Sequence, residues 1–428
     1  MKKVLIITNL NPHLIRASAR VPGLAKYLSQ FGWEAVVLTV PFPQKLAPEF
    51  RTIETPYTGD IFWFWRKISK SLGFKQQESI LNQAKEKIGF TSQKSLIDRI
   101  FNLYLTIFAY PDGYKHWKKT AIKIASNILE KEKFKAIISS SSPVTAHIIA
   151  SQLKKKSNIP WIADLRDLWT QNHNYSYPWW RKIFERKFEI KILSSADVLI
   201  TTSQPMAEQL KELHKGKDVY TITNGFDPER VNGSLAKLTN KFTVTYTGQI
   251  YAGKQNPLKI LDAIKDLISD GVVEKNEVEI RFYGPQYYWL EKEIEKRGLS
   301  AIVKQYGMVQ KEISLKRQWE SQILLLLNWE DEKEKGIYTG KIFEYLVAQR
   351  PILVTGGFGG DVSENLLKET KAGVSCSEIE EIKNSLKRFY LEYKQNGRVT
   401  YCGNWEEIKK YSHLEMARKF AEILNSLI

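Results

Sequence analysis

The chain has 428 residues, of which 43% are hydrophobic and 26% are charged, with a formal net charge of +17. This is the composition of a globular protein, and no run approaches the ~20 apolar residues that span a bilayer. The length exceeds what one typical core supports, so two domains are expected. Six scattered histidines and two cysteines, Cys376 and Cys402, match no metal-ligand spacing, and so few cysteines suggest a reducing compartment.

The N-terminus is basic, but its apolar run covers only Val4 to Ile7, which predicts a first strand rather than a signal peptide. Most of the excess positive charge lies in the first half of the chain. Residues 1–231 hold 35 Lys and Arg against 20 Asp and Glu, whereas residues 232–428 hold 29 against 27. A basic half suits nucleic acid, an anionic membrane surface or an anionic ligand. No nucleic-acid-binding motif accompanies the charge, so nucleic acid is not expected as a partner.

The first predicted unit is a strand at 2–8, a helix at 21–32 and a strand at 33–40. It lacks the GxGxxG turn of dinucleotide-binding folds. Arg16 and Arg20 lie in or beside the loop after the first strand, where open α/β sheets bind ligands. We expect them either to hold an anionic group of an acceptor or to be ordinary exposed arginines.

Aromatic and basic residues occur together in two stretches before residue 115. Residues 61–74 place four consecutive aromatic residues before Arg66, Lys67 and Lys70, and residues 99–111 form a second apolar-aromatic run. Such a mixture suits the interface of an anionic bilayer. The alternative is that both segments are helices that cover the sheet or pack on each other.

The alternation of helix and strand continues to residue 231. Helices are expected at 118–132, 144–156, 181–196 and 205–214, and strands at 134–142, 160–169 and 197–203. The strand within 160–169 ends in Asp164, Arg166 and Asp167, at the carboxyl edge of the predicted sheet. Carboxylates at this edge can orient an acceptor hydroxyl or a sugar. The alternative is an internal Arg–Asp ion pair that shapes the loop.

The composition changes at residues 227–241, which hold proline, glycine and serine and few apolar residues. A second alternation of strands and helices begins at 242–248. Alternation twice over predicts an α/β protein with two parallel, doubly wound, Rossmann-like domains that face each other across a cleft. We place the domains at 1–231 and 232–410, and expect a C-terminal helix within 411–428 to return to the first domain.

The segment GIYTGKIFEYLVAQRPILVTGG, residues 336–357, predicts a helix that starts just after Gly340 and stops before Pro351, then a buried strand. Lys341 lies in the first turn of this helix, and Glu344 lies one turn further in. Free backbone N–H groups, the positive end of the helix dipole and a lysine together form an anion site. A carboxylate beside them can accept hydrogen bonds from sugar hydroxyls, so the pattern describes a nucleotide site. The alternative is an ordinary crossover with a surface lysine.

The order of the motifs resembles that of the retaining glycosyltransferases of family 4, which have the GT-B architecture. The resemblance rests on ADVLITTS, MAEQLKEL, VYTITNGFDPE, VTYTG, IRFYGP, YGMV, ILLLL and TGKIFEYLVAQRPIL in this order. SSSPVTAH followed by IADLRDLW is similar to a bacterial branch that acts on surface polysaccharides. The resemblance covers almost the whole chain and is strongest at 196–227 and 336–355.

The resemblance implies that the second domain binds the donor, a UDP- or GDP-sugar, and the first binds the acceptor, with no metal or other cofactor. Glu344 matches the carboxylate that binds the ribose, and Lys254 matches the lysine at the diphosphate. The expected donor-binding residues are Gly248, Gln249, Lys254, Gly284, Met308, Val309, Tyr338, Thr339, Gly340, Lys341 and Glu344. Those expected to act in catalysis are Lys254, Lys341, Asp164 and Asp167. Those expected to contact the acceptor are Arg16, Arg20, Ser141 and Arg166.

The sequence departs from the family pattern at the donor sugar. The family often has two glutamates eight positions apart, but Gly336 stands eight residues before Glu344, and Glu334 is two residues off. The first glutamate usually lies near the donor sugar. Recognition of the sugar is therefore expected to differ here, through backbone N–H groups of the loop and Tyr338.

Two further family residues are absent. A family arginine near the diphosphate falls at Gln249, and Lys341 can compensate for the lost charge. A histidine often found after the fourth strand is replaced within 139–142. Asp164 or Asp167 is expected to align the acceptor instead.

The expected reaction transfers a sugar, with retention of configuration, to a hydroxyl of a glycan acceptor, expected to be lipid-linked, in cell-surface polysaccharide synthesis. The enzyme is expected in the cytoplasm, peripheral on the inner face of the cell membrane. Two alternatives stay open: a sugar-nucleotide epimerase of the same architecture and a non-catalytic membrane-associated scaffold. An epimerase needs acid–base residues at the donor sugar, and the histidines do not cluster at these motifs. Glu344 and Lys341 argue against a scaffold.

Overall fold

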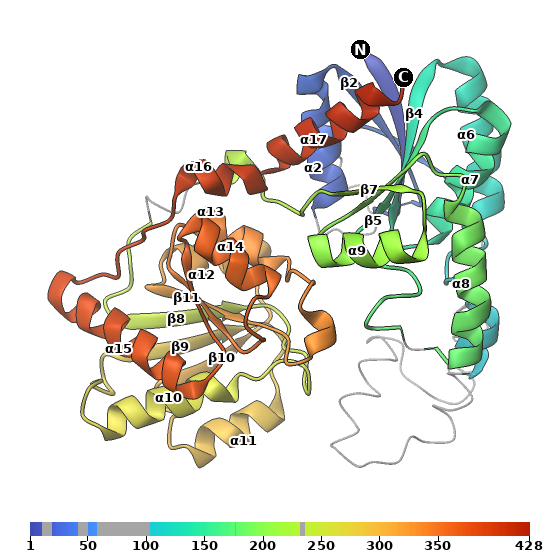
Figure 1. Ribbon diagram of the computed structural model, residues 1–428. Helices are drawn as coiled ribbons and strands as arrows, with labels where there is room; N and C mark the ends of the chain where they lie inside the picture. Colours follow the sequence, from blue (N-terminus) through green and yellow to red (C-terminus); the bar gives the residue numbers. More distant parts are fainter. Residues whose placement is uncertain (11–18, 42–49, 58–102, 176, 232–235) are drawn as a thin grey trace.

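The computed structural model describes residues 1–10, 19–41, 50–57, 103–175, 177–231 and 236–428. These residues form two lobes, each built on one parallel sheet with helices packed on it (Figure 1). Among them, no helix is long and apolar enough to cross a membrane.

The first lobe contains seven strands in the order β3-β2-β1-β4-β5-β6-β7. The strands are β1 (Lys2–Ile7), β2 (Trp33–Thr39), β3 (Arg51–Glu54), β4 (Phe134–Ser141), β5 (Trp161–Leu165), β6 (Val198–Thr201) and β7 (Asp218–Thr221). The helices described for this lobe are α2 (Arg20–Tyr27), α6 (Trp117–Lys131), α7 (Thr145–Ser157), α8 (Trp179–Leu193) and α9 (Gln204–Leu213). All the strand pairs are parallel, as helical crossovers between strands require.

Side chains of β1 alternate between two helix layers. Val4 and Ile6 pack in one core with residues of α2, whereas Leu5 and Ile7 pack in another with residues of α6 and α7. A strand that is buried on both faces has a continuous apolar sequence, and this strand could be predicted for that reason.

The second lobe contains six parallel strands in the order β10-β9-β8-β11-β12-β13. The strands are β8 (Phe242–Thr247), β9 (Val278–Tyr283), β10 (Val303–Gly307), β11 (Ile323–Leu327), β12 (Ile352–Thr355) and β13 (Gly373–Cys376). The helices are α10 (Leu258–Ser269), α11 (Tyr288–Lys296), α12 (Lys311–Trp319), α13 (Lys341–Ala348), α14 (Val362–Thr370), α15 (Ile379–Asn396) and α16 (Trp405–Ile408).

The C-terminal helix α17 (His413–Ser426) returns to the first lobe and lies against α2 (Figure 1). Phe420 joins the core that contains Leu24, and the Oδ1 atom of Asn425 accepts a hydrogen bond of 3.2 Å from the indole of Trp33. The predicted fold class, including the returning helix, is therefore confirmed. The division into domains with separate roles at 231/232 and 410/411 stays a prediction.

The structure adds elements that the sequence analysis did not name. They include the edge strand β3, whose sequence RTIE is short and largely polar, and the elements α14, β13 and α15 near the C-terminus. Strand β13 is only four residues long and mostly half-buried, so its sequence carries little of the apolar signal that marks the inner strands.

Candidate active site

The predicted donor residues lie along the carboxyl edge of the second sheet. In the observed strand order, β9 and β10 follow β8 on one side, and the chain then crosses back to place β11 on the other side of β8. The crevice outside the carboxyl ends at such a reversal is where open α/β sheets bind ligands. The segments after β8 and β11 flank it, and they carry Lys254 and the 336–344 stretch respectively.

Two glycines allow chain segments at this edge of the sheet to approach one another closely. Gly248, after β8, has φ +124°, and a Cβ atom placed there would lie 2.2 Å from Cε of Lys341. A Cβ atom on Gly284, after β9, would lie 2.1 Å from the carbonyl oxygen of Gly248. Only glycine fits either position without displacing a neighbour. The lysine therefore reaches the crevice through space that Gly248 leaves open.

Lys341 is the first residue of α13, as predicted. Its burial lowers the pKa of the ammonium to about 8. The Nζ atom lies 5.1 Å from the ring centroid of Tyr246, and no carboxylate of the described residues forms an ion pair with it. A buried cation without a partner is costly, and an anionic ligand would remove that cost. The hydroxyl of Thr339, next to the helix start, is also buried and without a hydrogen-bond partner.

Glu344 is half-buried one turn into α13, and its carboxylate is held by neighbouring side chains. It accepts hydrogen bonds from Lys311 and from the amide of Gln318. Gln318 also donates to Oγ1 of Thr247 at 2.9 Å, and the Tyr345 hydroxyl accepts a 3.0 Å hydrogen bond from the backbone N–H of Thr247. These contacts fix the carboxylate relative to the end of β8, where it can receive a diol.

A second charged cluster bridges the two lobes. Glu334 is buried, and its carboxylate lies 3.1 Å from Nζ of Lys254 and 3.8 Å from Nε2 of His173. His173 and Asn174 belong to the loop after β5 of the first lobe, and Lys254 donates a hydrogen bond to Asn174. Burial lowers the pKa of His173, so its imidazole is neutral near pH 7. The Oε2 atom of Glu334 has no hydrogen-bond partner in the described structure.

Gly336 lies where the resemblance would place a glutamate. A Cβ atom on Gly336 would lie 2.8 Å from Cβ of Pro205, at the start of α9 in the first lobe. A larger side chain at this position would push the lobes apart, which gives the departure a physical cause. The nearest carboxylate, that of Glu334, points instead at Lys254 and His173.

The other predicted donor residues follow the neighbouring strands at the same edge. Gln249 follows β8 and is exposed, and Met308 and Val309 follow β10. Tyr338 precedes α13 and is half-buried, and burial raises the pKa of its phenol to about 12. The structure thus brings the predicted donor residues to one edge of the sheet.

Arg20 and Asp164 face the interior of the first lobe. Arg20 is the first residue of α2, and its guanidinium lies 2.8 Å from the carboxylate of Asp164, with both side chains almost completely buried. Asp164 also accepts a 2.7 Å hydrogen bond from Ser140, and Arg20 donates to the carbonyls of Ile222 and Thr223. The internal ion pair weighed for Asp164 therefore exists, but with Arg20 rather than Arg166. We leave both residues out of the proposed acceptor site.

The remaining predicted acceptor residues lie at the carboxyl edge of the first sheet. Arg166 donates to the backbone carbonyls of Ser141 and Ser142. The hydroxyl of Ser141 is buried without a partner, and Asp167 is exposed. Arg16 lies outside the described residues, as do the aromatic stretch 61–74 and the start of 99–111.

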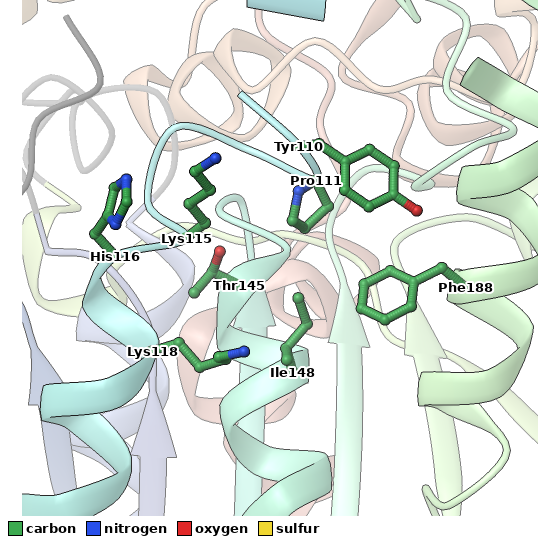
Figure 2. Close-up of a pocket in the computed structure, with 8 residues that line it drawn as sticks. All are labelled: Tyr110, Pro111, Lys115, His116, Lys118, Thr145, Ile148 and Phe188. Atoms are coloured by element: carbon green, nitrogen blue, oxygen red, sulfur yellow. The ribbon is translucent and has the colours of Figure 1, made fainter. Parts of the chain in front are cut away.

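A hollow of about 310 Å³ lies on the flank of the first lobe, apart from the predicted donor residues. Figure 2 shows Tyr110 and Phe188 on one side of it and Lys115, His116 and Lys118 on the other. None of the residues predicted for the active site lines this hollow. Geometry at the carboxyl edges, rather than the size of a hollow, therefore identifies the candidate site.

Sequence reasoning missed several residues that contact the predicted set. Gln318 and Lys311 hold Glu344, and His173 and Asn174 reach Glu334 and Lys254 from the other lobe. The sequence identifies Glu334 only as a glutamate two residues away from the position of the family glutamate. No periodicity marks such residues, because their proximity arises from how distant segments pack.

Comparison with known proteins supports the interpretation of the fold. Residues 98–230 match the family model described as Glycosyltransferase Family 4. No curated protein sequence matches the chain. A glycosyltransferase from Rickettsia africae is 13% identical, with 100% of this chain and 98% of that chain covered and a TM-score of 0.62.

Two further solved structures are similar over nearly the full length. Anabaena HepE, in complex with UDP and glucose, is 12% identical, with both chains covered to 100% and a TM-score of 0.63. A mutant of TarM from S. aureus, in complex with fondaparinux, alpha-GlcNAc-glycerol and UDP, is 13% identical, with 99% and 100% covered and a TM-score of 0.57. At these identities, the likeness establishes the shared GT-B fold.

The two-lobed fold and the family match in the first lobe both agree with a nucleotide-sugar glycosyltransferase. The match of residues 98–230 to the family 4 model and the GT-B fold of the whole chain agree with each other. The predicted GT-B fold is therefore confirmed, and the match in the first lobe favours sugar transfer over the epimerase and scaffold alternatives.

Proposed function

We propose that the second lobe binds a UDP-sugar, with the diphosphate at the start of α13 and the ribose at Glu344. The observation that carries this proposal is the ammonium of Lys341 at the start of α13, whose pKa is lowered by burial and which forms no ion pair with a carboxylate of the described residues. HepE and TarM, which share the fold, are described in complex with UDP. GDP-sugars stay a second donor class that a direct comparison must separate.

The segments after β8, β9 and β10 complete the proposed donor site. Gly248 and Gly284 let these segments approach closely, and Gln249 lies beside them. Met308 and Val309, after β10, offer apolar surface on which the nucleotide base can lie. Met308 is 72% exposed, and a bound base would cover it.

The donor sugar is proposed to lie toward the cluster of Glu334, Lys254 and His173. Glu334 is the carboxylate nearest to the position that Gly336 cannot fill, and its unpaired oxygen can accept a hydrogen bond from a sugar hydroxyl. Lys254 is proposed to turn from Glu334 to the diphosphate when the donor binds. Tyr338 and the loop N–H groups stay part of the proposed sugar contacts.

The proposed mechanism is displacement on the face from which the diphosphate departs. The bond between the acceptor oxygen and the anomeric carbon forms, the bond from that carbon to the phosphate oxygen breaks, and the acceptor proton passes to the leaving phosphate. Lys254, Lys341 and the N–H groups at Gly340 would stabilise the charge on the leaving group. Loss of one such charge is expected to raise the barrier by ~2.7–4 kcal/mol.

The proposed acceptor is a hydroxyl of a lipid-linked glycan used in cell-surface polysaccharide synthesis, at the inner face of the cell membrane. Ser141, Arg166 and Asp167 lie at the carboxyl edge of the first sheet, and the neighbouring loop reaches the donor cluster through His173. These residues would contact or align the acceptor. We propose residues 1–231 as the acceptor domain and 232–410 as the donor domain, completed by 411–428.

A thermal-shift panel of nucleotides and sugar nucleotides tests the proposal, because a ligand that prefers the folded state raises the melting temperature. UDP and UDP-sugars are expected to stabilise the wild-type protein more than GDP, ADP and their sugars do. Lys341→Ala should lose this stabilisation, whereas Lys333→Ala, an exposed lysine of the same segment, should keep it. Equal shifts in both variants would remove Lys341 from the donor site.

A further inference from the structure

Helix α8 exposes large apolar side chains and buries charged ones, which is the reverse of an ordinary surface helix. Trp179 is 75% exposed and Phe184 is 63% exposed, and Trp180, Ile183 and Ile190 are exposed as well. The side chains that point inward from the same helix include Arg181, Glu185 and Glu189, all buried. An ordinary surface helix buries its apolar stripe and exposes its charges.

The buried charges of α8 are fully engaged, so the orientation of the helix is fixed. Glu185 accepts hydrogen bonds of 2.7 Å from the indole of Trp169 and from the hydroxyl of Tyr175, and it pairs with Arg181 at 3.1 Å. Glu189 accepts a 3.0 Å hydrogen bond from the backbone N–H of Thr170. Rotating α8 to hide its aromatic residues would break this network and leave charges buried without partners.

The segment 103–111 adds apolar surface next to α8. Arg181 donates hydrogen bonds to backbone carbonyls of this segment, including 2.7 Å bonds to Thr106 and Ala109. In this segment the side chains of Leu103, Ile107 and Phe108 are exposed. The same arginine therefore holds two elements that both present large apolar side chains outward.

The exposed face of α8 is positively charged as well as apolar. Arg186, Lys187 and Lys191 are exposed and Lys182 is half-buried, whereas the two carboxylates of the helix are both buried. No carboxylate of α8 thus opposes an anionic surface. Aromatic and aliphatic residues interleaved with cations match the interface of a bilayer that contains anionic lipid.

We propose that the outer face of α8, with Leu103, Ile107 and Phe108, is the surface by which this enzyme docks on an anionic lipid bilayer. The helix lies on the outer flank of the first lobe (Figure 1). The loop that carries His173 and Asn174 ends at the start of α8, so docking there places the membrane next to the proposed acceptor lobe. This deepens the proposed function, which takes a lipid-linked acceptor, but the surface can be tested without it.

Flotation with lipid vesicles at physiological salt tests the surface. The full chain is expected to float with vesicles of phosphatidylcholine that contain phosphatidylglycerol, and not with phosphatidylcholine alone. Trp179→Ser/Phe184→Ser should lower partitioning more than tenfold, because each side chain gains ~1.5–3 kcal/mol on burial. Lys187→Gln/Lys191→Gln should lower it by about fivefold per charge removed, at ~1 kcal/mol for each cation.

A matched control is Tyr288→Ser, which removes an aromatic side chain that is 76% exposed on α11 of the second lobe. This variant should float like the wild type. Flotation of Trp179→Ser/Phe184→Ser at the wild-type level, or no flotation of the wild type, would overturn the proposal. So would a wild-type dimer that the double variant abolishes without any vesicle binding, since the face would then be a protein interface.

Nucleotide binding separates this proposal from the proposed function. The α8 variants should keep the thermal shift with UDP, which also shows that they are folded. A wild-type protein that floats but binds no nucleotide would reject the donor assignment and leave the docking surface standing. A protein that binds UDP but does not bind anionic vesicles would reject the docking surface and leave the donor assignment standing.

Discussion

Lys341 is the residue on which the proposed donor site depends most. Its ammonium is buried at the start of α13, its pKa is lowered to about 8 by burial, and no described carboxylate pairs with it. Such a group destabilises the unliganded protein, and a bound diphosphate would remove this destabilisation. The arrangement favours an anion over a neutral ligand at the same place.

The first prediction concerns the pH dependence of UDP affinity. Because the pKa of Lys341 is lowered to about 8, the free protein loses this proton as the pH rises through 8, and UDP must then bind with proton uptake. Affinity measured by calorimetry should be constant from pH 7 to just below 8, and should fall above it by up to about tenfold per pH unit.

Burial also lowers the pKa of Lys311 to about 8, so a variant must separate the two lysines. Lys341→Met should bind UDP weakly with little change between pH 7 and 9, whereas Lys311→Met should keep the fall above pH 8. A steep fall in the Lys341→Met protein would assign the titration to another group.

The second prediction concerns Glu344 and the ribose. Hydrogen bonds to a charged group contribute ~1.5–3 kcal/mol, so Glu344→Gln should weaken UDP binding about tenfold or more. The same variant should bind 2′,3′-dideoxy-UDP as the wild type does, since that ligand has no diol to donate. Calorimetry with both ligands gives the comparison, with the exposed Glu332→Gln as control. An equal loss for both ligands would contradict contact with the diol.

At the scale of elements, the site is made where strand ends meet helix starts. Strands β8, β9 and β11 end at one edge because all strands of the sheet are parallel, and α13 begins there with Lys341. The turns at Gly248 and Gly284 approach each other closely at this edge. The chemistry thus follows from the topology together with two residues that lack a Cβ atom.

The third prediction tests this closeness with Gly248→Ala. The new methyl group would meet Lys341, and φ of +124° is strained for alanine, so stability should fall by ~1–3 kcal/mol and UDP affinity should fall with it. Gly253→Ala is the control, because this glycine has φ +76° but open space around it. Denaturant unfolding and calorimetry measure the two effects. Equal UDP affinity in both variants would show that the contact with Lys341 does not matter.

The inner elements could be predicted from the sequence, whereas the outer ones could not. Runs such as VLII and ILLLL are buried on both faces of a sheet, and burial leaves a strong apolar signal. The edge strand β3 and the short β13 carry no such run. Helix α8 could be predicted as a helix, but its sequence does not tell which face is buried, since the buried Glu185 and Glu189 depend on partners from other elements.

At the scale of the whole molecule, specific contacts between described residues join the two lobes. His173 and Asn174 reach Glu334 and Lys254, and Pro205 packs on Gly336. These contacts join residues that are roughly 80 to 160 positions apart in the sequence, and their spacing carries no local pattern. The proposed donor residues at the start of α13 could be named from the sequence because they are close together in the chain, but the bridging cluster required the folded chain.

The whole molecule also explains why Gly336 replaces a glutamate. The backbone at this position is pressed against α9 of the first lobe, so a carboxylate there is incompatible with the observed approach of the lobes. The carboxylate of Glu334, in the same loop, lies instead next to Lys254. We therefore propose that both lobes, and not the α13 segment alone, contribute to recognition of the donor sugar.

A crystal structure of the protein with UDP tests the central claim most directly. The account predicts that the diphosphate lies within hydrogen-bond distance of Nζ of Lys341 and of the N–H groups at the start of α13, with the ribose hydroxyls on Glu344. A diphosphate bound elsewhere, for example among the lysines of the flank hollow in Figure 2, would contradict it.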